Sequence, residues 1–329
     1  MTNTSSDVRL VEDLNRKHTE LKKEISKVIV GQQEIIDRIL IAILAQGHCM
    51  LVGVPGLAKT LIVKTLADVL DLNYNRIQFT PDLMPSDITG TEILESTTSG
   101  EKVFKFIKGP VFSNMLLADE INRTPPKTQS ALLEAMQEHK VTAAGVTYRL
   151  DEPFFVLATQ NPIEQEGTYP LPEAQLDRFM FNLWLDYPTG EEEIEIVNKT
   201  TSSYSPALSH IFSKQEIIDF QSLIKRVPVA EEVIKYAVSQ VRKTRPQNPE
   251  SPDFIKNYIN YGAGPRASQY LILGAKTLAV LEGRYTPEIE DIKKVAKPVL
   301  RHRLITNFNS DADNISTLDL IDKLFMFDN

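Results

Sequence analysis

One run of eight residues constrains the fold of this chain more than any other feature of the sequence. The run, Gly53-Val-Pro-Gly56-Leu-Ala58-Lys59-Thr60, follows a short apolar segment at 48–53 and precedes a segment of helical periodicity at 60–70. A glycine-rich turn between a strand and a helix directs backbone N–H groups and the positive end of the helix toward a phosphate. The run therefore predicts a parallel α/β domain that binds ATP.

Within this loop, Lys59 is expected to reach the β- and γ-phosphates, and Thr60 to offer its hydroxyl to Mg²⁺. Ala58 stands where the motif has glycine, and we expect its φ to stay below zero, because only a positive φ penalises a Cβ. The alternative, an ordinary Gly-Pro turn before a helix, leaves the following Lys-Thr pair unexplained. The residues predicted to bind the nucleotide are Gly53, Val54, Pro55, Gly56, Leu57, Ala58, Lys59, Thr60 and Leu61.

Two adjacent carboxylates end a later apolar segment, 115–118. Asp119 at the carboxyl end of such a strand is placed to hold Mg²⁺ together with Thr60. Glu120 is placed to polarise a water for attack on the γ-phosphate. The alternative is a strand that simply ends in a polar turn, and the upstream phosphate loop favours the catalytic interpretation.

Apolar runs that alternate with helical stretches indicate strand-helix-strand units. The fold class predicted is a three-layer α/β domain with a mainly parallel five-stranded sheet, preceded by an N-terminal amphipathic helix and followed by a helical lid. We expect the strands at 48–53, 76–79, 114–120, 153–161 and 179–185, and helices at 33–45, 60–70 and 128–138. Two insertions interrupt this pattern, a turn-rich stretch at 81–110 with a loop tip at 96–100, and a β-hairpin at 140–150 around Ala144-Gly145.

A domain boundary is predicted at Tyr187-Pro188-Thr189-Gly190, which divides the chain into 1–189 and 190–329. Beyond it no strand is expected. Helical periodicity covers 214–225, 230–243, 265–281 and 286–295, and the last of these helices is expected to begin at Thr286-Pro287 with Glu288 in its first turn.

Composition limits the classes of function. The 36 Lys and Arg against 44 Asp and Glu give a net charge of -8, which disfavours binding to nucleic acid. The single cysteine, Cys49, rules out an intrachain disulfide, and the five histidines do not pair at a metal-ligand spacing. The polar residues 1–7 do not form a signal core, and the longest apolar run, 39–45, is too short to span a membrane. We therefore expect a cytoplasmic protein without membrane insertion.

Five motifs in order make the sequence resemble the MoxR family of AAA+ ATPases. They are the phosphate loop, Leu116 to Arg123 (LLADEINR), Pro126 to Met136 (PKTQSALLEAM), Ala158 to Pro162 (ATQNP) and Glu173 to Phe179 (EAQLDRF). The similarity extends over nearly the whole chain and is strongest from about 28 to 190.

The resemblance implies further site residues. Asn161 matches the first sensor, which orients the attacking water; the alternative is a turn-forming Asn before Pro162. Arg178 resembles an arginine finger directed at a neighbouring subunit's γ-phosphate; the alternative is a surface arginine paired with Asp177. Arg266 resembles the second sensor and is expected to touch the γ-phosphate of its own chain.

Two positions keep two interpretations each. Gly31, in Val30-Gly31-Gln32, either lines the adenine pocket, as the resemblance implies, or only breaks a helix. Arg123 either contacts another subunit or pairs with Asp119 or Glu120.

The resemblance also implies an Mg²⁺-dependent ATPase that forms a ring of six subunits and does mechanical work on a client protein. A chaperone-like role in maturing a protein complex follows, with a partner that carries a von Willebrand factor A domain. The insertions at 81–110 and 140–150 would line a pore or contact the client. Two other functions remain open, a DNA-associated motor and a nucleotide-dependent switch with little turnover; Glu120 argues against the switch.

Overall fold

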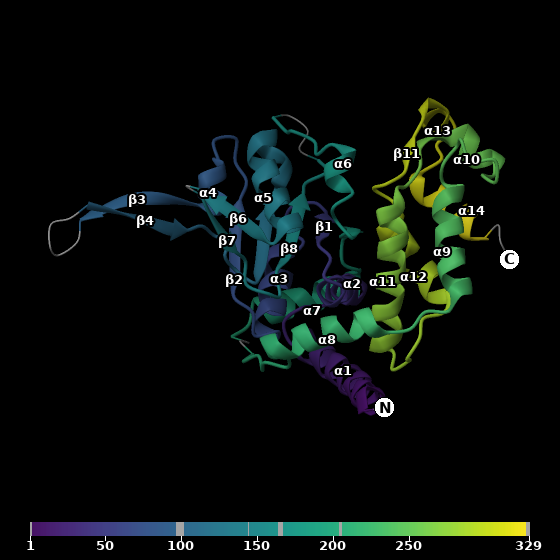
Figure 1. Cartoon of the computed structure of the whole chain (residues 1–329). Coiled ribbons are helices and arrows are strands. Elements are labelled where there is room, and N and C mark those ends of the chain that lie inside the picture. The colour runs from purple at the N-terminus through teal and green to yellow at the C-terminus, as the bar shows by residue number, and fades with distance from the viewer. Residues whose placement is uncertain (1, 97–101, 144, 164–166, 204–205, 327–329) are drawn as a thin grey trace.

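The computed structural model describes residues 2–96, 102–143, 145–163, 167–203 and 206–326. An α/β part carries the sheet, and a helical part stands beside it, with α1 (Thr2–Ser26) and α8 (Lys214–Arg226) lying beneath both (Figure 1). None of the helices among these residues is long and apolar enough to cross a membrane.

Five parallel strands form the central sheet in the order β2-β5-β8-β1-β9. Each coincides with a segment that the sequence predicts as a strand, which confirms the five-stranded parallel sheet. Their bounds are β1 (Cys49–Val52), β2 (Tyr74–Gln78), β5 (Met115–Asp119), β8 (Phe155–Gln160) and β9 (Phe181–Trp184). The inner strands are buried on both faces, as their nearly continuous apolar sequences require.

Helices cover both faces of this sheet. Cys49 and Leu51 point into the core that contains α2 (Gln33–Leu44) and α3 (Lys59–Val69). Met50 and Val52 point into a second core that contains α5 (Pro126–Glu138). This alternation along one strand confirms the three-layer arrangement.

Both insertions form antiparallel ribbons. β3 (Gly90–Ser96) and β4 (Lys102–Lys108) pair into a long arm that projects from the body, where the sequence predicts only a turn-rich stretch (Figure 1). The predicted loop tip at 96–100 lies outside the described residues beyond Ser96. β6 (Lys140–Ala143) and β7 (Val146–Arg149) confirm the predicted hairpin, although Ala144 at its turn lies outside the described residues.

Short helices fill the remaining connections. α4 (Pro85–Thr89) leads into the arm, and α6 (Glu173–Leu176) precedes β9. From residue 190 on, the helices are α7 (Gly190–Thr200), α8, α9 (Glu231–Lys243), α10 (Asp253–Tyr258), α11 (Pro265–Leu281), α12 (Ile289–Leu300), α13 (Phe308–Ala312) and α14 (Thr317–Met326).

The helical lid is confirmed, with two corrections to its details. Three-residue β10 (Ile259–Tyr261) pairs with two-residue β11 (Ile305–Thr306), and strands this short leave no periodic pattern in a sequence. α12 begins at Ile289 rather than at Thr286, because the Glu288 N–H donates to Asp291 Oδ2 over 2.8 Å and so caps the helix there. The boundary at 189/190 stays a prediction, since α8 packs against α1 and α2 as well as α11.

Candidate functional site: a phosphate loop and an acidic pair at the carboxyl edge of the sheet

The phosphate loop connects β1 to α3, as predicted. Its backbone curls through left-handed conformations at Gly56 (φ 87°) and Ala58 (φ 56°). The expectation of a negative φ at Ala58 is therefore wrong: the loop needs the left-handed turn there, and Ala58 accepts the steric strain that glycine would avoid. A Cβ added at Gly56 would meet nothing within 4 Å, so the concave side of the loop faces open space. Backbone N–H groups in a loop of this shape favour the binding of an anion.

Lys59 lies in the first turn of α3 and donates to the carbonyl oxygen of Gly53 across the loop. Partial burial lowers the pKa of Lys59, and the charges of Asp119 and Glu120 oppose that change. The ammonium group is therefore close enough to both carboxylates to feel their charge. The loop and the acidic pair belong to one site.

An apolar cavity of about 270 Å³ adjoins the loop. Leu57 and the exposed Leu61 form one side of it, and the C-terminal half of α7, with Ile196, Lys199 and Thr200, forms another. Val30 and Gln32 line this cavity. Gly31 does not, but it has a φ of 67°, and a Cβ at this position would overlap the Glu192 carboxylate of α7. An apolar cavity next to a phosphate loop fits a planar base.

Asp119 ends β5 and is almost buried. Its Oδ1 accepts from the Thr159 hydroxyl at 2.5 Å, and its Oδ2 accepts from Arg76 Nη2 at 2.7 Å and Nε at 3.1 Å. The Thr159 oxygen also accepts from the Glu120 N–H at 2.8 Å. One threonine of β8 thus fixes both members of the acidic pair.

Glu120 adopts a left-handed backbone (φ 57°) just beyond the strand. Its Oε2 accepts from Gln78 Nε2 at 2.7 Å and from Arg123 Nη1 at 3.0 Å. This ion pair between Arg123 and Glu120 agrees with one of the two interpretations of Arg123. Both of these donors bind Oε2, so among the described contacts Oε1 is left to accept a hydrogen bond from a water.

Sequence reasoning missed Arg76, Gln78 and Thr159. A signal was present: Arg76 and Gln78 alternate along β2, and Gln78 is in register with Asp119 of the next strand. Polar residues that share one face at the end of an otherwise apolar sheet belong to a site more often than to the core.

The donor set fits a magnesium ion. Mg²⁺ prefers oxygen ligands and usually takes one or two from the protein and the others from water and phosphate. Thr60, beside Lys59, and Asp119 would supply the two protein oxygens, and the bound ion would neutralise phosphate charge. Within the described ranges no group of three His, Cys, Asp or Glu could form a metal cage of its own.

Asn161 follows β8 and is almost buried. Its Oδ1 accepts from the Ile163 N–H at 3.1 Å, which is the turn-forming contact of the alternative interpretation. Its position just beyond the strand that carries Thr159 keeps it at the carboxyl edge of the sheet, beside the acidic pair. The sensor role stays a prediction.

Arg178 and Arg266 lie at the opposite edge of the sheet. Met180 N donates to His48 O at 2.7 Å, which places the Arg178 segment at the amino ends of β1 and β9. Arg266, at the start of α11, donates to Asp177 Oδ2 at 3.0 Å, and both arginines line one hollow of about 190 Å³. The expectation that Arg266 touches the γ-phosphate of its own chain is corrected by this placement, because β1 separates it from the loop by about 13 Å.

The alternative pairing of Arg178 with Asp177 is also absent among the described contacts. Arg178 Nη1 donates instead to the carbonyl of Leu133 in α5, at 2.8 Å. Asp177 is held by Arg266 and by Arg303. Among the described contacts, the Arg178 guanidinium is therefore bonded to a backbone carbonyl and not to a carboxylate.

A phosphate loop after β1, an acidic pair at the end of β5 on the other side of β8, and a helical lid define an ATPase of the AAA class. Residues 48–181 match the family model described as ATPase family associated with various cellular activities (AAA), and residues 254–324 match the AAA lid domain. The fold class and the enzyme class predicted from the sequence are both confirmed.

Similar proteins identify the family. The chain is 44% identical to Chaperone MoxR1 of Mycobacterium tuberculosis over 92% of this chain and 79% of that protein. It is 29% identical to Protein MoxR of Methylorubrum extorquens over 86% of each. A crystal structure of a candidate ATPase from Cytophaga hutchinsonii superimposes with a TM-score of 0.92 at 45% identity, over 99% of this chain and 98% of that one. The chain belongs to the MoxR family of AAA ATPases.

Proposed function

We propose that this ATPase works as a ring, of six subunits by the family resemblance, in which each active site is shared by two neighbours. The observation that carries the proposal is the position of Arg178 and Arg266. Both lie at the amino edge of the sheet, and the phosphate loop lies at the carboxyl edge. Arginines serve phosphoryl transfer when they neutralise charge on the transferred group. Here they serve a neighbour's nucleotide.

In this proposal the residues of one chain bind and orient Mg²⁺-ATP. The loop N–H groups and Lys59 hold the phosphates, and the apolar cavity holds the base. Thr60 and Asp119 would hold Mg²⁺, which would neutralise phosphate charge. Glu120 accepts the proton of the attacking water on Oε1, while Gln78 and Arg123 hold Oε2. Asn161 orients the water, and the neighbour's Arg178 and Arg266 supply positive charge as the γ-phosphate leaves.

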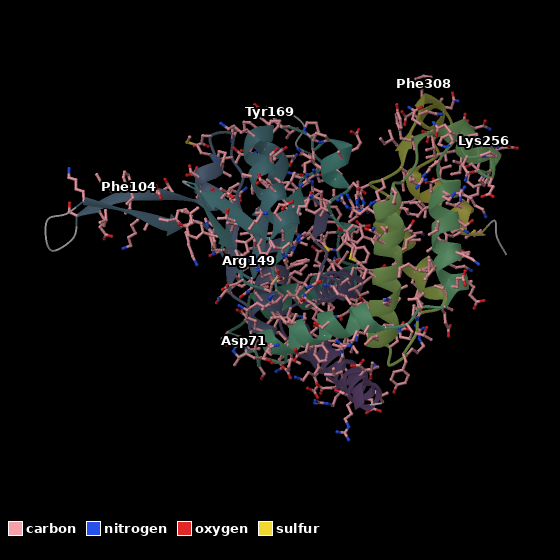
Figure 2. The ribbon with its side chains drawn as sticks, viewed as in Figure 1. Asp71, Phe104, Arg149, Tyr169, Lys256 and Phe308 are labelled. Carbon is pink, nitrogen blue, oxygen red and sulfur yellow. The ribbon has the colours of Figure 1, made fainter. Side chains whose placement is uncertain are left out.

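The work done by this cycle is proposed to be chaperone-like remodelling of a client protein in the cytoplasm. Chaperone MoxR1 carries that activity in its name, and the two hairpins of this chain offer a contact surface. Phe104 is 74% exposed and lies on the projecting arm (Figure 2). An exposed aromatic on a projecting ribbon suits contact with another protein. A partner with a von Willebrand factor A domain fits the same proposal.

Mixing two inactive variants tests the shared site. Lys59→Ala removes the phosphate contact and leaves the arginines, and Arg178→Ala removes an arginine and leaves the loop. Each is expected to lose at least about 100-fold in Mg²⁺-dependent turnover, since an arginine of this kind is worth about 10³–10⁵ in rate. In a randomly mixed ring roughly one quarter of the interfaces regain both parts, so equal mixing should restore up to that fraction of wild-type turnover.

Exposed Arg242 of α9 gives the matched control, because Arg242→Ala removes a lid guanidinium outside the proposed interface. It should keep wild-type turnover. Turnover per subunit should also rise with protein concentration in the wild type. Mixtures that stay inactive while sedimentation shows mixed oligomers would contradict the shared site.

A further inference from the structure

Arg303, just beyond α12, is the most deeply buried arginine whose contacts reach from the lid to the sheet. Its side chain is only 2% exposed. The Nε donates to Asp177 Oδ1 at 2.7 Å, and Nη2 donates to the carbonyls of Asp177 and Phe179 at 2.8 and 2.7 Å. Nη1 donates to the carbonyls of Met180, at 3.3 Å, and of Val299. All five N–H groups of the guanidinium therefore have an oxygen acceptor.

This saturation explains how a charged side chain stays buried. Burial lowers the pKa of Arg303, and the neighbouring Asp177 carboxylate opposes that change. A buried guanidinium is tolerated only when its donors are used and its charge is matched. Four of its five acceptors belong to residues 177–180, so most of the stabilisation depends on that segment keeping its shape.

The segment in question contains Arg178. Tyr270 of α11 donates its hydroxyl to the Arg178 carbonyl at 3.2 Å. Together with the bonds from Arg303, this gives each of the four consecutive carbonyls at 177–180 a donor from a lid side chain. The Arg303 guanidinium also lies over the Tyr270 ring, 5.2 Å from its centroid, so the two lid residues contact each other as well as the segment.

We propose that Arg303, with Tyr270 beside it, is the positioning residue that sets the direction of Arg178 and couples it to the lid. The inference rests on the proposed role of Arg178 at a neighbour's nucleotide. The backbone of Arg178 follows the lid, because its own carbonyl and those on both sides are bonded to α11 and to the end of α12. A change in lid angle at one site therefore moves the arginine presented to the next.

The test places a substitution in only one of two mixed subunits. Lys59→Ala subunits donate Arg178, and Arg178→Ala subunits accept it at their intact loop. Arg303→Lys keeps the positive charge but loses the planar set of five donors. Placed in the donor, it should lower the restored turnover at least about 10-fold; placed in the acceptor, it should change it less than about 2-fold.

Matched and milder variants complete the design. Arg284→Lys is the control, because Arg284 pairs with Asp291 and Glu282 inside the lid and, among the described residues, has no hydrogen bond to residues 177–180. Tyr270→Phe removes a single hydroxyl, and it decides the question if Arg303→Lys subunits do not assemble. It should lower the restored turnover several-fold in the donor only.

The outcomes separate the two proposals. Equal losses in donor and acceptor, or no loss in either, would overturn the positioning role while leaving the shared site intact. A mixture that shows no restored turnover even with Arg303 and Tyr270 unchanged would overturn the shared site and this inference with it.

Discussion

His48 gives a prediction that links acid pH to stability. This histidine precedes β1 and lines the same hollow as Arg178 and Arg266. Its Nδ1 accepts from the Val156 N–H at 3.1 Å, so Nε2 carries the proton and donates to the Met136 carbonyl at 3.2 Å. The neutral ring is fully used, and a second proton would break the bond to Val156.

Burial lowers the pKa of His48 from 6.5 to about 4. Because the unfolded chain takes up the proton first, the contribution of His48 to folding is fully present above pH 6.5 and is lost as the pH falls toward 4. One pH unit is worth about 1.36 kcal/mol for one proton. The linkage relation then gives a loss of about 2 kcal/mol at pH 5 and about 3 kcal/mol at pH 4.

The assay is urea unfolding at pH 7.5, 6, 5 and 4 for the wild type and His48→Asn. Asparagine keeps an oxygen that accepts from Val156 but does not titrate in this range. His48→Asn is expected to be less stable at pH 7.5 because it loses the bond to Met136, and this deficit should shrink by about 2 kcal/mol at pH 5. Exposed His210 supplies the control, since His210→Asn removes a histidine without a buried ring.

A stability difference between wild type and His48→Asn that stays constant from pH 7.5 to 4 would refute the reasoning. It would mean either that the ring is protonated in the folded state or that the surroundings relax to hydrate it. A change of the same size in His210→Asn would show instead that the titration belongs to the unfolded chain in general.

Two further predictions concern the nucleotide site. Ala58→Gly should raise the free energy of unfolding by about 0.5–1 kcal/mol, because relief of the left-handed strain exceeds the added entropy of the unfolded chain. Thermal unfolding measures this difference. A lower melting temperature for Ala58→Gly than for the wild type would contradict the strained φ. Thr159→Val should lower ATP turnover at least about 10-fold while fluorescent-nucleotide affinity changes only a few-fold, because its hydroxyl orders Asp119 and Glu120 rather than the phosphate loop. Unchanged turnover in Thr159→Val would show that the acidic pair needs no such support.

The sequence was sufficient for the sheet, the loop and the acidic pair because each leaves a local pattern. A strand buried on both faces is nearly continuous in apolar residues, and the residues that follow it mark the edge where ligands bind. Asp119 and Glu120 could be located at that edge because they interrupt such a run at its end, and their roles stay predictions. Only the local geometry at Ala58 was wrong, since a φ angle depends on the loop's closure and not on the residue alone.

The positions that sequence reasoning misplaced or missed depend on contacts distant along the chain. Arg266 follows Gly264-Pro265, a pattern that predicts the start of a helix. This pattern does not predict which edge of the sheet α11 approaches. Its position is set by Asp177, 89 residues away, and that of Arg303 by bonds across 123–126 residues. Arg76 and Thr159 likewise meet at Asp119 only once β2, β5 and β8 are paired.

The two edges of one sheet therefore carry the two parts of the proposed catalytic site. A site built from different surfaces of identical chains requires a head-to-tail contact, and such a contact repeats until it closes into a ring or continues as a filament. Closure depends on the angle between the loop surface and the arginine surface. In the proposed coupling, Arg303 and Tyr270 bond the arginine segment to the lid, so that angle depends on how the lid sits on the sheet. A nucleotide that changes the lid angle would then act on the neighbouring site and on the shape of the ring in one movement.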